Sequence, residues 1–283
     1  MKNTIGLSLI LLSVPLFSSV SFRLSSEAIS EGDGNFKAAV ERAPVIVELF
    51  TSEGCSSCPP ADQLLARLEA GQPVSGALII PLSEHVDYWN RLGWADPYSS
   101  GSFSERQSEY ARVFSTDGVY TPQMVVDGRA EFVGSNSDEA RRAITEAARR
   151  PKAGIQLALK SGVESHGQLA LSIRIEPLAG LNTEDTSEVI LAITENGLSS
   201  SVSRGENAGR KLTHTAVVRK LKSLGVLEKG KGFSTTVPTD IESAWKSENV
   251  RAVVFVQERA SRRILGAAIT TLKQSSSKES AGD

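Results

Sequence analysis

Cys55 and Cys58 are the two cysteines of this 283-residue chain, and two serines separate them. The apolar run at residues 44–50 precedes them and is expected to form a strand buried on both faces. Pro59 and Pro60 follow, and proline is tolerated only before or within the first turn of a helix. The pair is therefore expected between the end of a strand and the start of a helix. The unpaired N–H groups at a helix N-terminus stabilise a thiolate, which is the nucleophile in disulfide exchange.

The roles of the two cysteines are expected by analogy with thioredoxin-like redox proteins. In that analogy Cys55 attacks and Cys58 resolves the mixed disulfide, which requires one sulfur to be accessible. Glu53 is a nearby anion that would oppose thiolate formation. The residues between the cysteines carry no charge, so the sequence leaves the direction of the redox reaction open.

The segments around the pair alternate between strand-like and helix-like patterns. Helical periodicity occurs at 61–70, 102–114 and 137–150, and strand-like runs occur at 77–85, 123–126 and 130–133. Asp127-Gly128 predicts a tight hairpin between the last two strands. The order is that of an α/β domain over residues 43–150. A CxxC pair at a strand-to-helix junction of such a domain is typical of thioredoxin-like redox proteins.

The resemblance to thioredoxin-like domains implies roles for Thr121, Pro122 and Glu48. Such domains place a cis-proline opposite the CxxC pair, and the preceding residue presents its backbone to a substrate peptide; Thr121-Pro122 fits this position. Glu48 is the one charge in the first apolar strand, and a buried carboxyl with a raised pKa can shuttle a proton. Its spacing from Cys55 is one residue longer than in thioredoxins. A glutamate that reaches solvent or a backbone partner explains Glu48 equally well.

The second apolar run ends in aromatic residues that are candidates for substrate binding. Tyr88 and Trp89 follow His85 at the carboxyl edge of the expected sheet, where ligands gather. They are alternatively packed aromatics beside a satisfied histidine. If His85 or His214 lay near the cysteines, a thioredoxin-like Cu(I)-binding metallochaperone would be indicated, since soft thiolates suit Cu(I).

A third interpretation of the pair is a structural disulfide in a non-catalytic binding protein, although a bridge that closes so short a loop adds little stability. The preferred interpretation is a thiol–disulfide oxidoreductase that acts on protein thiols or disulfides. It needs neither a metal nor another cofactor.

The residue composition and the hydrophobic pattern change after Pro151, where β-branched residues and alternating patterns dominate. Strands are expected at 155–160, 169–175, 189–194, 250–257 and 264–272. They predict an antiparallel β-sandwich-like domain at 151–274, followed by a disordered polar tail at 275–283. Within it, Asn207, Arg210 and His214 belong to a dense polar stretch. Together with Arg219, these side chains could face a partner or the first domain. Alternatively, and preferably, the stretch is only a strand followed by a solvated loop.

The N-terminus has the pattern of a secretory signal peptide. Lys2 precedes a 13-residue apolar run at 5–17, and small residues at 18–21 offer a cleavage site. The run is short for a bilayer core of about 30 Å, so no membrane insertion is expected after cleavage. Residues 1–21 are therefore predicted to be removed and residues 22–42 to form a polar tail. The predicted location is periplasmic or secreted, where disulfides persist.

Composition excludes several classes of function. The chain has 31 basic and 33 acidic residues, which argues against a surface that follows nucleic-acid phosphates. Three Trp, four Tyr and nine Phe residues are too few to favour stacking platforms for bases. Two cysteines cannot supply a four-thiolate zinc site. The sequence predicts no oligomeric state.

Four blocks of the sequence resemble one known family. Residues 47–62 are similar to the pattern of the secreted thioredoxin-like family catalogued as domain of unknown function number 1223. Residues 85–97, 120–128 and 209–219 match its later blocks. The resemblance covers nearly the whole mature chain. It implies a thioredoxin-like fold followed by a β-rich C-terminal part, and it implies no substrate.

Overall fold

The computed structural model describes residues 42–160, 169–177, 185–239 and 241–272. The predicted signal peptide at 1–21, the tail at 22–42 apart from Arg42, and the polar tail at 275–283 lie outside the described residues. No described helix combines the length and the apolar composition needed to cross a membrane.

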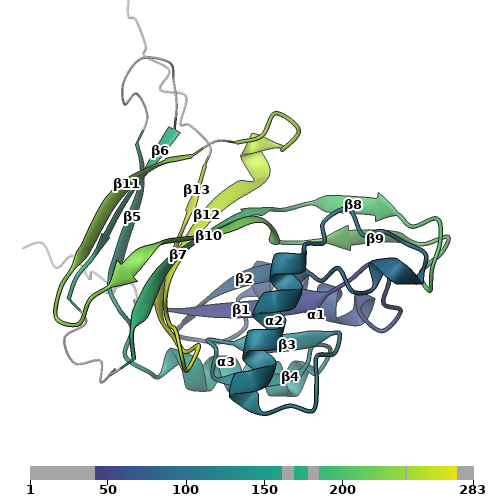
Figure 1. Ribbon diagram of the computed structural model, residues 1–283, viewed down its shortest axis with the longest axis horizontal. Coiled ribbons are helices and arrows are strands. Elements are labelled where there is room, and N and C mark those ends of the chain that lie inside the picture. Colours follow the sequence, from purple (N-terminus) through teal and green to yellow (C-terminus); the bar gives the residue numbers. More distant parts are fainter. Residues whose placement is uncertain (1–41, 161–168, 178–184, 240, 273–283) are drawn as a thin grey trace, which may run out of the picture. The chain divides into compact units, whose positions relative to one another are not determined.

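One mixed sheet of eight strands dominates the described residues, in the spatial order β13-β12-β7-β10-β2-β1-β3-β4 (Figure 1). Its strands are β1 (Ala43–Thr51), β2 (Ala77–His85), β3 (Gln123–Val126), β4 (Ala130–Val133), β7 (Ser187–Glu195), β10 (Val217–Leu227), β12 (Val250–Glu258) and β13 (Ile264–Thr271). β2 is parallel to both of its neighbours, β1 and β10, and the other pairings are antiparallel.

Two smaller sheets and three α-helices complete the described fold. The first small sheet holds β11 (Phe233–Thr239), β6 (Leu169–Ile175) and β5 (Ile155–Lys160), and the second is a hairpin of β8 (Leu198–Ser201) and β9 (Lys211–His214). The helices are α1 (Pro59–Gly71), α2 (Gly101–Phe114) and α3 (Ser137–Ala148), and single 3-10 turns occur at η1 (Asn90–Leu92) and η2 (Ser247–Asn249). β9 contacts α1, so the hairpin lies beside the helix that follows the cysteines.

The prediction of a thioredoxin-like α/β domain followed by a β-sandwich-like domain is wrong. The large sheet continues across the expected boundary because β2 pairs with β10 at Ser83 and Val217. At this junction the main-chain N–H of Ser83 donates to the carbonyl of Ala216 at 2.8 Å. Strands outnumber helices, with thirteen strands and three α-helices among the described residues. The edge at which a distant strand joins a sheet leaves no periodic pattern in the sequence, so the local patterns did not reveal this continuity.

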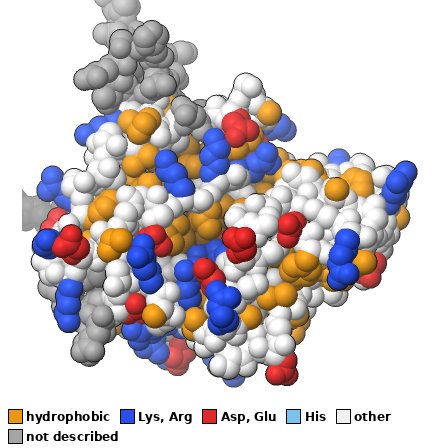
Figure 2. All heavy atoms as spheres, viewed as in Figure 1, with side chains coloured by type: hydrophobic (Ala, Val, Ile, Leu, Met, Phe, Trp, Pro, Cys, Tyr) orange, Lys and Arg blue, Asp and Glu red, His pale blue; other side chains and the backbone are white. Residues whose placement is uncertain are grey.

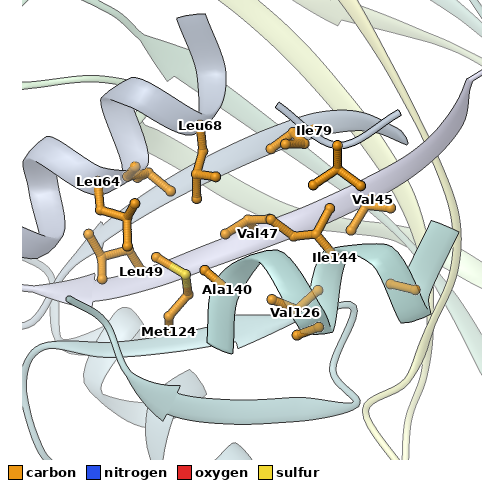
Figure 3. Close-up of a cluster of buried hydrophobic side chains, with 14 of the residues drawn as sticks. Val45, Val47, Leu49, Leu64, Leu68, Ile79, Met124, Val126, Ala140 and Ile144 are labelled. Atoms are coloured by element: carbon orange, nitrogen blue, oxygen red, sulfur yellow. The ribbon is translucent and has the colours of Figure 1, made fainter. Parts of the chain in front are cut away.

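One face of β1 is covered by α1 and α3. Alternate β1 residues, among them Val47 and Leu49, pack against Leu64 and Leu68 of α1 and Ile144 of α3 (Figure 3). The period of 3.6 in α1 and of 2 in β1 places these side chains on facing surfaces. This apolar layer fixes the start of α1 against the end of β1, which is where the cysteines lie.

The opposite face of β1 forms a core that both halves of the chain share. Ile46 and Leu82, from β1 and β2, belong to the same buried cluster as Ile190, Val218 and Phe255 of β7, β10 and β12. A further cluster packs β7 and β12 against the three-stranded sheet. Neither half therefore buries its apolar surface alone.

On the molecular face shown in Figure 2, acidic and basic side chains are intermixed.

Candidate functional site

Cys55 and Cys58 are joined by a disulfide directly before α1, with 5.4 Å between their Cα atoms. Cys58 is the residue that precedes the helix, and Pro59 and Pro60 occupy its first turn. A tight turn holds the pair, because the main-chain N–H of Cys55 donates to the Ser52 carbonyl and that of Cys58 to the Cys55 carbonyl, each at 3.2 Å. The predicted position between a strand end and a helix start is confirmed.

Both cysteines are fully buried in this oxidised state, with an exposed fraction of 0 %. Ser56 and Ser57, which lie between them, are exposed. The Cys55 sulfur lies 3.3 Å from the Ser57 hydroxyl oxygen. The expectation that one sulfur is reachable from solvent is therefore wrong for the oxidised pair.

A loop from the C-terminal half, residues 203–210 between β8 and β9, binds the cysteine turn; we call it the covering loop. The side-chain amide of Asn207 donates to the carbonyls of Glu53 and Cys55 at 2.8 and 2.9 Å. Glu206 accepts from the main-chain N–H of Ser56 at 3.0 Å and from its hydroxyl at 2.6 Å. These two bonds lower the pKa of Glu206. Asn207 is completely buried and Glu206 is exposed. The covering loop is therefore held by one buried side-chain amide and one exposed carboxylate.

The side chain of Glu53 points into a buried polar cluster under the cysteine turn. One carboxylate oxygen lies 2.9 Å from Nε2 of His214, at the end of β9. The other accepts from the indole N–H of Trp94 at 2.8 Å. Glu53 is 0 % exposed, so this charge is held away from water by specific partners.

His85 and Asp96 form a second buried pair in the same cluster, with 2.7 Å between Nδ1 and Oδ2. Burial would lower the pKa of His85, but the charge and the hydrogen bond of Asp96 raise it. Burial would raise the pKa of Asp96, but His85 and the main-chain N–H groups of Glu53 and Tyr98 lower it. The rings of His85 and His214 meet edge to face, with 4.7 Å between centroids. The cluster therefore joins the turn after β1 with the ends of β2 and β9.

Asp62 adds a carboxyl to this cluster from the first turn of α1. Its main-chain N–H donates to the Cys58 carbonyl at 3.1 Å, as expected four residues into a helix, so the two side chains share a helix face. The hydroxyl of Thr51 donates to its carboxylate at 2.9 Å. Burial raises the pKa of Asp62, and the charges of His214 and His85 oppose this.

The comparison with known families decides where this chain belongs. Residues 46–257 match the family described as "Protein of unknown function (DUF1223)". The chain is a member of this family. The predicted membership of the family of unknown function number 1223 is thereby confirmed. No curated protein matches the chain.

Two solved structures are similar to this DUF1223 protein. Protein AGR_C_4864 from Agrobacterium tumefaciens is 26% identical, with a TM-score of 0.64, and the match covers 83% of this chain and 97% of the other. HBP35 of Porphyromonas gingivalis is 15% identical, with a TM-score of 0.56, and the match covers 81% and 75%. The second likeness concerns the fold alone.

The DUF1223 chain places Glu48 in a different buried network. Glu48 points to the α2 face of β1, where Nε of Arg106 donates to one carboxylate oxygen at 2.6 Å and the hydroxyl of Tyr110 to the other at 2.5 Å. Glu84 of β2 lies on the same side, 3.5 Å from Nε of Arg106. α1 covers the opposite face, through Leu49 and its neighbours. The structure therefore pairs Glu48 with Arg106, on the face of β1 opposite the one that α1 covers.

Thr121, Pro122 and Trp89 lie together beside the cysteine turn. The peptide bond between Thr121 and Pro122 is cis, as predicted. The indole N–H of Trp89 donates to the Thr121 hydroxyl at 2.8 Å, and the Cβ of Trp89 would lie 3.2 Å from a Cβ placed on Gly54. Tyr88 is half-buried, donates to Gln107, and burial raises its pKa to about 12. Trp89 thus connects the turn to the Thr121-Pro122 segment.

The described side chains do not fit the metal-binding alternative in this state. Among them, no group of three His, Cys, Asp or Glu side chains could hold a metal ion. The sulfurs of Cys55 and Cys58 are bonded to each other. Nδ1 of His85 binds Asp96 and Nε2 of His214 binds Glu53, whereas the other nitrogen of each ring has no hydrogen-bond partner among the described residues.

Sequence reasoning missed Asp62 and Asp96 as direct partners of this region, and it named Asn207 only as a side chain that could face the first domain. Asp62 is four residues after Cys58, a spacing that places both on one side of a helix, and this signal was available. Asp96 and Asn207 come from loops whose contacts depend on the tertiary fold. Their partners Glu53 and Cys55 could not be found from spacing.

Proposed function

We propose that the chain is an exported thiol–disulfide oxidoreductase that acts on protein thiols or disulfides, with Cys55 as nucleophile and Cys58 as resolving cysteine. The observation that carries this proposal is the bonded cysteine pair at the N-terminus of α1, above a buried cluster of carboxyl and imidazole groups. The helix N-terminus favours the thiolate that exchange requires. The predicted signal peptide supports a periplasmic or secreted location.

The exchange proceeds through a mixed disulfide. A partner thiolate attacks the Cys55 sulfur, a bond forms between the two sulfurs, and the Cys55–Cys58 bond breaks. The electron pair leaves on Cys58, which takes up a proton. A second partner thiolate then attacks the partner sulfur and releases Cys55 as a thiolate, so the partner dithiol is oxidised and the cysteine pair is reduced. The reverse sequence reduces a partner disulfide.

The Thr121-Pro122 segment and the aromatic residues Tyr88 and Trp89 are proposed to bind the substrate polypeptide. Trp89 supports this role, because it packs at Gly54 and donates to Thr121 and so connects the Thr121-Pro122 segment with the cysteine turn. A substrate bound there would reach Cys55 once the covering loop has moved. In this proposal, the fully buried cysteine pair corresponds to a closed form of the site.

The test is a pair of measurements on the full mature chain. Equilibration with dithiol buffers gives the reduction potential of the Cys55–Cys58 pair, and Cys58→Ser, which keeps the Cys55 thiol, should form a lasting mixed disulfide with a disulfide-containing polypeptide. Cys55→Ser should abolish both turnover and this trapping. A Cys55→Ser variant with full activity would remove the mechanism.

Complete burial of both sulfurs favours a second candidate, a structural disulfide in a non-catalytic binding protein. Structural disulfides have potentials below about −300 mV, and accessible catalytic ones lie higher. A potential below that range, together with failure of Cys58→Ser to form a mixed disulfide, would establish this second candidate.

A further inference from the structure

The covering loop binds main-chain groups of the cysteine turn rather than its side chains alone. Asn207 donates to the carbonyls of Glu53 and Cys55, and Glu206 accepts from the N–H of Ser56. Two carbonyl acceptors and one N–H donor within four residues are the groups that an extended polypeptide also satisfies with its own backbone. The loop therefore occupies, with side chains, the hydrogen bonds that a polypeptide main chain could make.

Resting on the proposed function, we propose that Asn207 determines substrate class: the covering loop excludes small thiols and yields to polypeptides that replace its bonds to the cysteine turn. When a small thiol displaces the covering loop, the carbonyl and N–H groups of the cysteine turn lose their protein partners and bind water. When a polypeptide displaces the loop, its own main chain replaces these hydrogen bonds. The difference between the two substrates arises from this replacement and not from the sulfur chemistry, which is the same in both.

Asn207 is a well-defined target because all polar atoms of its side chain are used. Its oxygen accepts from Nη1 of Arg210 at 2.7 Å, which fixes the amide nitrogen toward Glu53 and Cys55. Gly205 and Gly209 flank the contact with φ of +75° and +80°, conformations that glycine adopts without strain. Asn207→Asp has the same shape but turns a carboxylate oxygen toward two carbonyls, so it should release the loop.

The experiment compares two thiols of matched chemistry on the oxidised full-length chain. One is N-acetyl-cysteinamide, and the other is an unstructured ten-residue peptide with the same central cysteine. For the natural sequence, the peptide should open the disulfide at least about tenfold faster, the effect of roughly one retained hydrogen bond. Asn207→Asp and Asn207→Ala should raise the rate with N-acetyl-cysteinamide by about the same factor and reduce the ratio toward one. Arg204→Ala, an exposed position on the same loop, is the matched control and should leave both rates unchanged.

A second measurement keeps the test valid if Asn207 variants fold poorly. Hydrogen exchange at the Ser56 main-chain N–H reports loop opening in the natural sequence, and Glu206→Gln, at an exposed residue, should speed this exchange and the small-thiol reaction moderately. Equal rates for both thiols in the natural sequence, or an unchanged small-thiol rate in a folded Asn207→Asp, would overturn the inference and leave the proposed function intact. If neither thiol opens the disulfide in any folded variant, both proposals fail together.

Discussion

The imidazole rings of His85 and His214 meet edge to face beneath the cysteine turn, with 4.7 Å between their centroids and 83° between their planes. His85 ends β2 and His214 ends β9, so the contact joins the two halves of the chain. Each ring pairs with a different buried carboxylate, Asp96 for His85 and Glu53 for His214. Charge compensation in this cluster therefore depends on residues from both halves.

Asp96→Asn should destabilise the fold by about 3 kcal/mol, because it leaves buried His85 without its compensating charge. The pKa of Asp96 is lowered, so its stabilisation is present above its ordinary value of 3.8 and is lost as the pH falls. The pKa of His85 is raised, so its stabilisation is present below 6.5 and is lost as the pH rises through the folded-state value. Urea unfolding across this range should show a flatter pH dependence in the variant. Asp117→Asn, an exposed control, should change stability by less than about 0.5 kcal/mol.

Glu84→Gln should stabilise the protein at alkaline pH. Burial, and next the charge of Glu48, raise the pKa of Glu84 well above its ordinary value of 4.5. Its contribution to stability is therefore fully present below pH 4.5 and is lost as the pH rises through the folded-state pKa. The variant keeps the neutral form at every pH, so its free energy of unfolding at pH 8 should exceed that of the natural sequence. Glu105→Gln, at an exposed position of α2, should not reproduce this gain.

Arg106→Met should cost about 3 to 5 kcal/mol, because Arg106 is the buried cation that faces both Glu48 and Glu84. It also donates to Gln257 of β12 at 2.9 Å. Adding Glu48→Gln to this variant should recover part of the loss by removing one uncompensated charge. Chemical denaturation of the single and double variants measures both effects. A double variant no more stable than Arg106→Met would contradict this explanation.

Gly128→Ala should lower the free energy of unfolding by at least about 2 kcal/mol. Gly128 has φ of +62°, and a Cβ there would lie 1.9 Å from the carbonyl oxygen of Arg262. The β3–β4 turn is thus pressed against the β12–β13 hairpin, where the N–H of Ile264 donates to the Asp127 carbonyl at 2.9 Å. Gly118→Ala is the control, since no atom lies within 4 Å of its added Cβ. Thermal melting of the two variants should differ clearly.

Local structure could be predicted from the sequence wherever one period dominates. Residues 61–70 show the helical spacing of α1, Asp127-Gly128 marks the β3–β4 turn, and the prolines after Cys58 indicate the helix start. These features depend on neighbours in the chain. The position of the cysteine pair followed from them.

Long-range pairing could not be predicted in the same way. The fold assignment failed at the junction of β2 and β10, where Ser83 and Val217 form the paired register. No local period distinguishes an open sheet edge from one that receives a strand. For Glu48 the sequence supports a proton relay to the cysteines and an unrelated partner equally well, and the pleat directs this side chain to Arg106 on the face opposite α1. Asn207 was noted as a polar residue that could face the other half, and its partner became clear only from the structure.

The junction of β2 with β10 also has a consequence for biosynthesis. The first half of the chain leaves the ribosome with the edge of β2 unpaired and with Ile46 and Leu82 lacking the β7, β10 and β12 side chains that bury them. An exposed strand edge beside an apolar surface favours aggregation. We therefore expect nascent or truncated chains that end before β7 to require a chaperone, and native folding to begin only after the C-terminal strands have been synthesised.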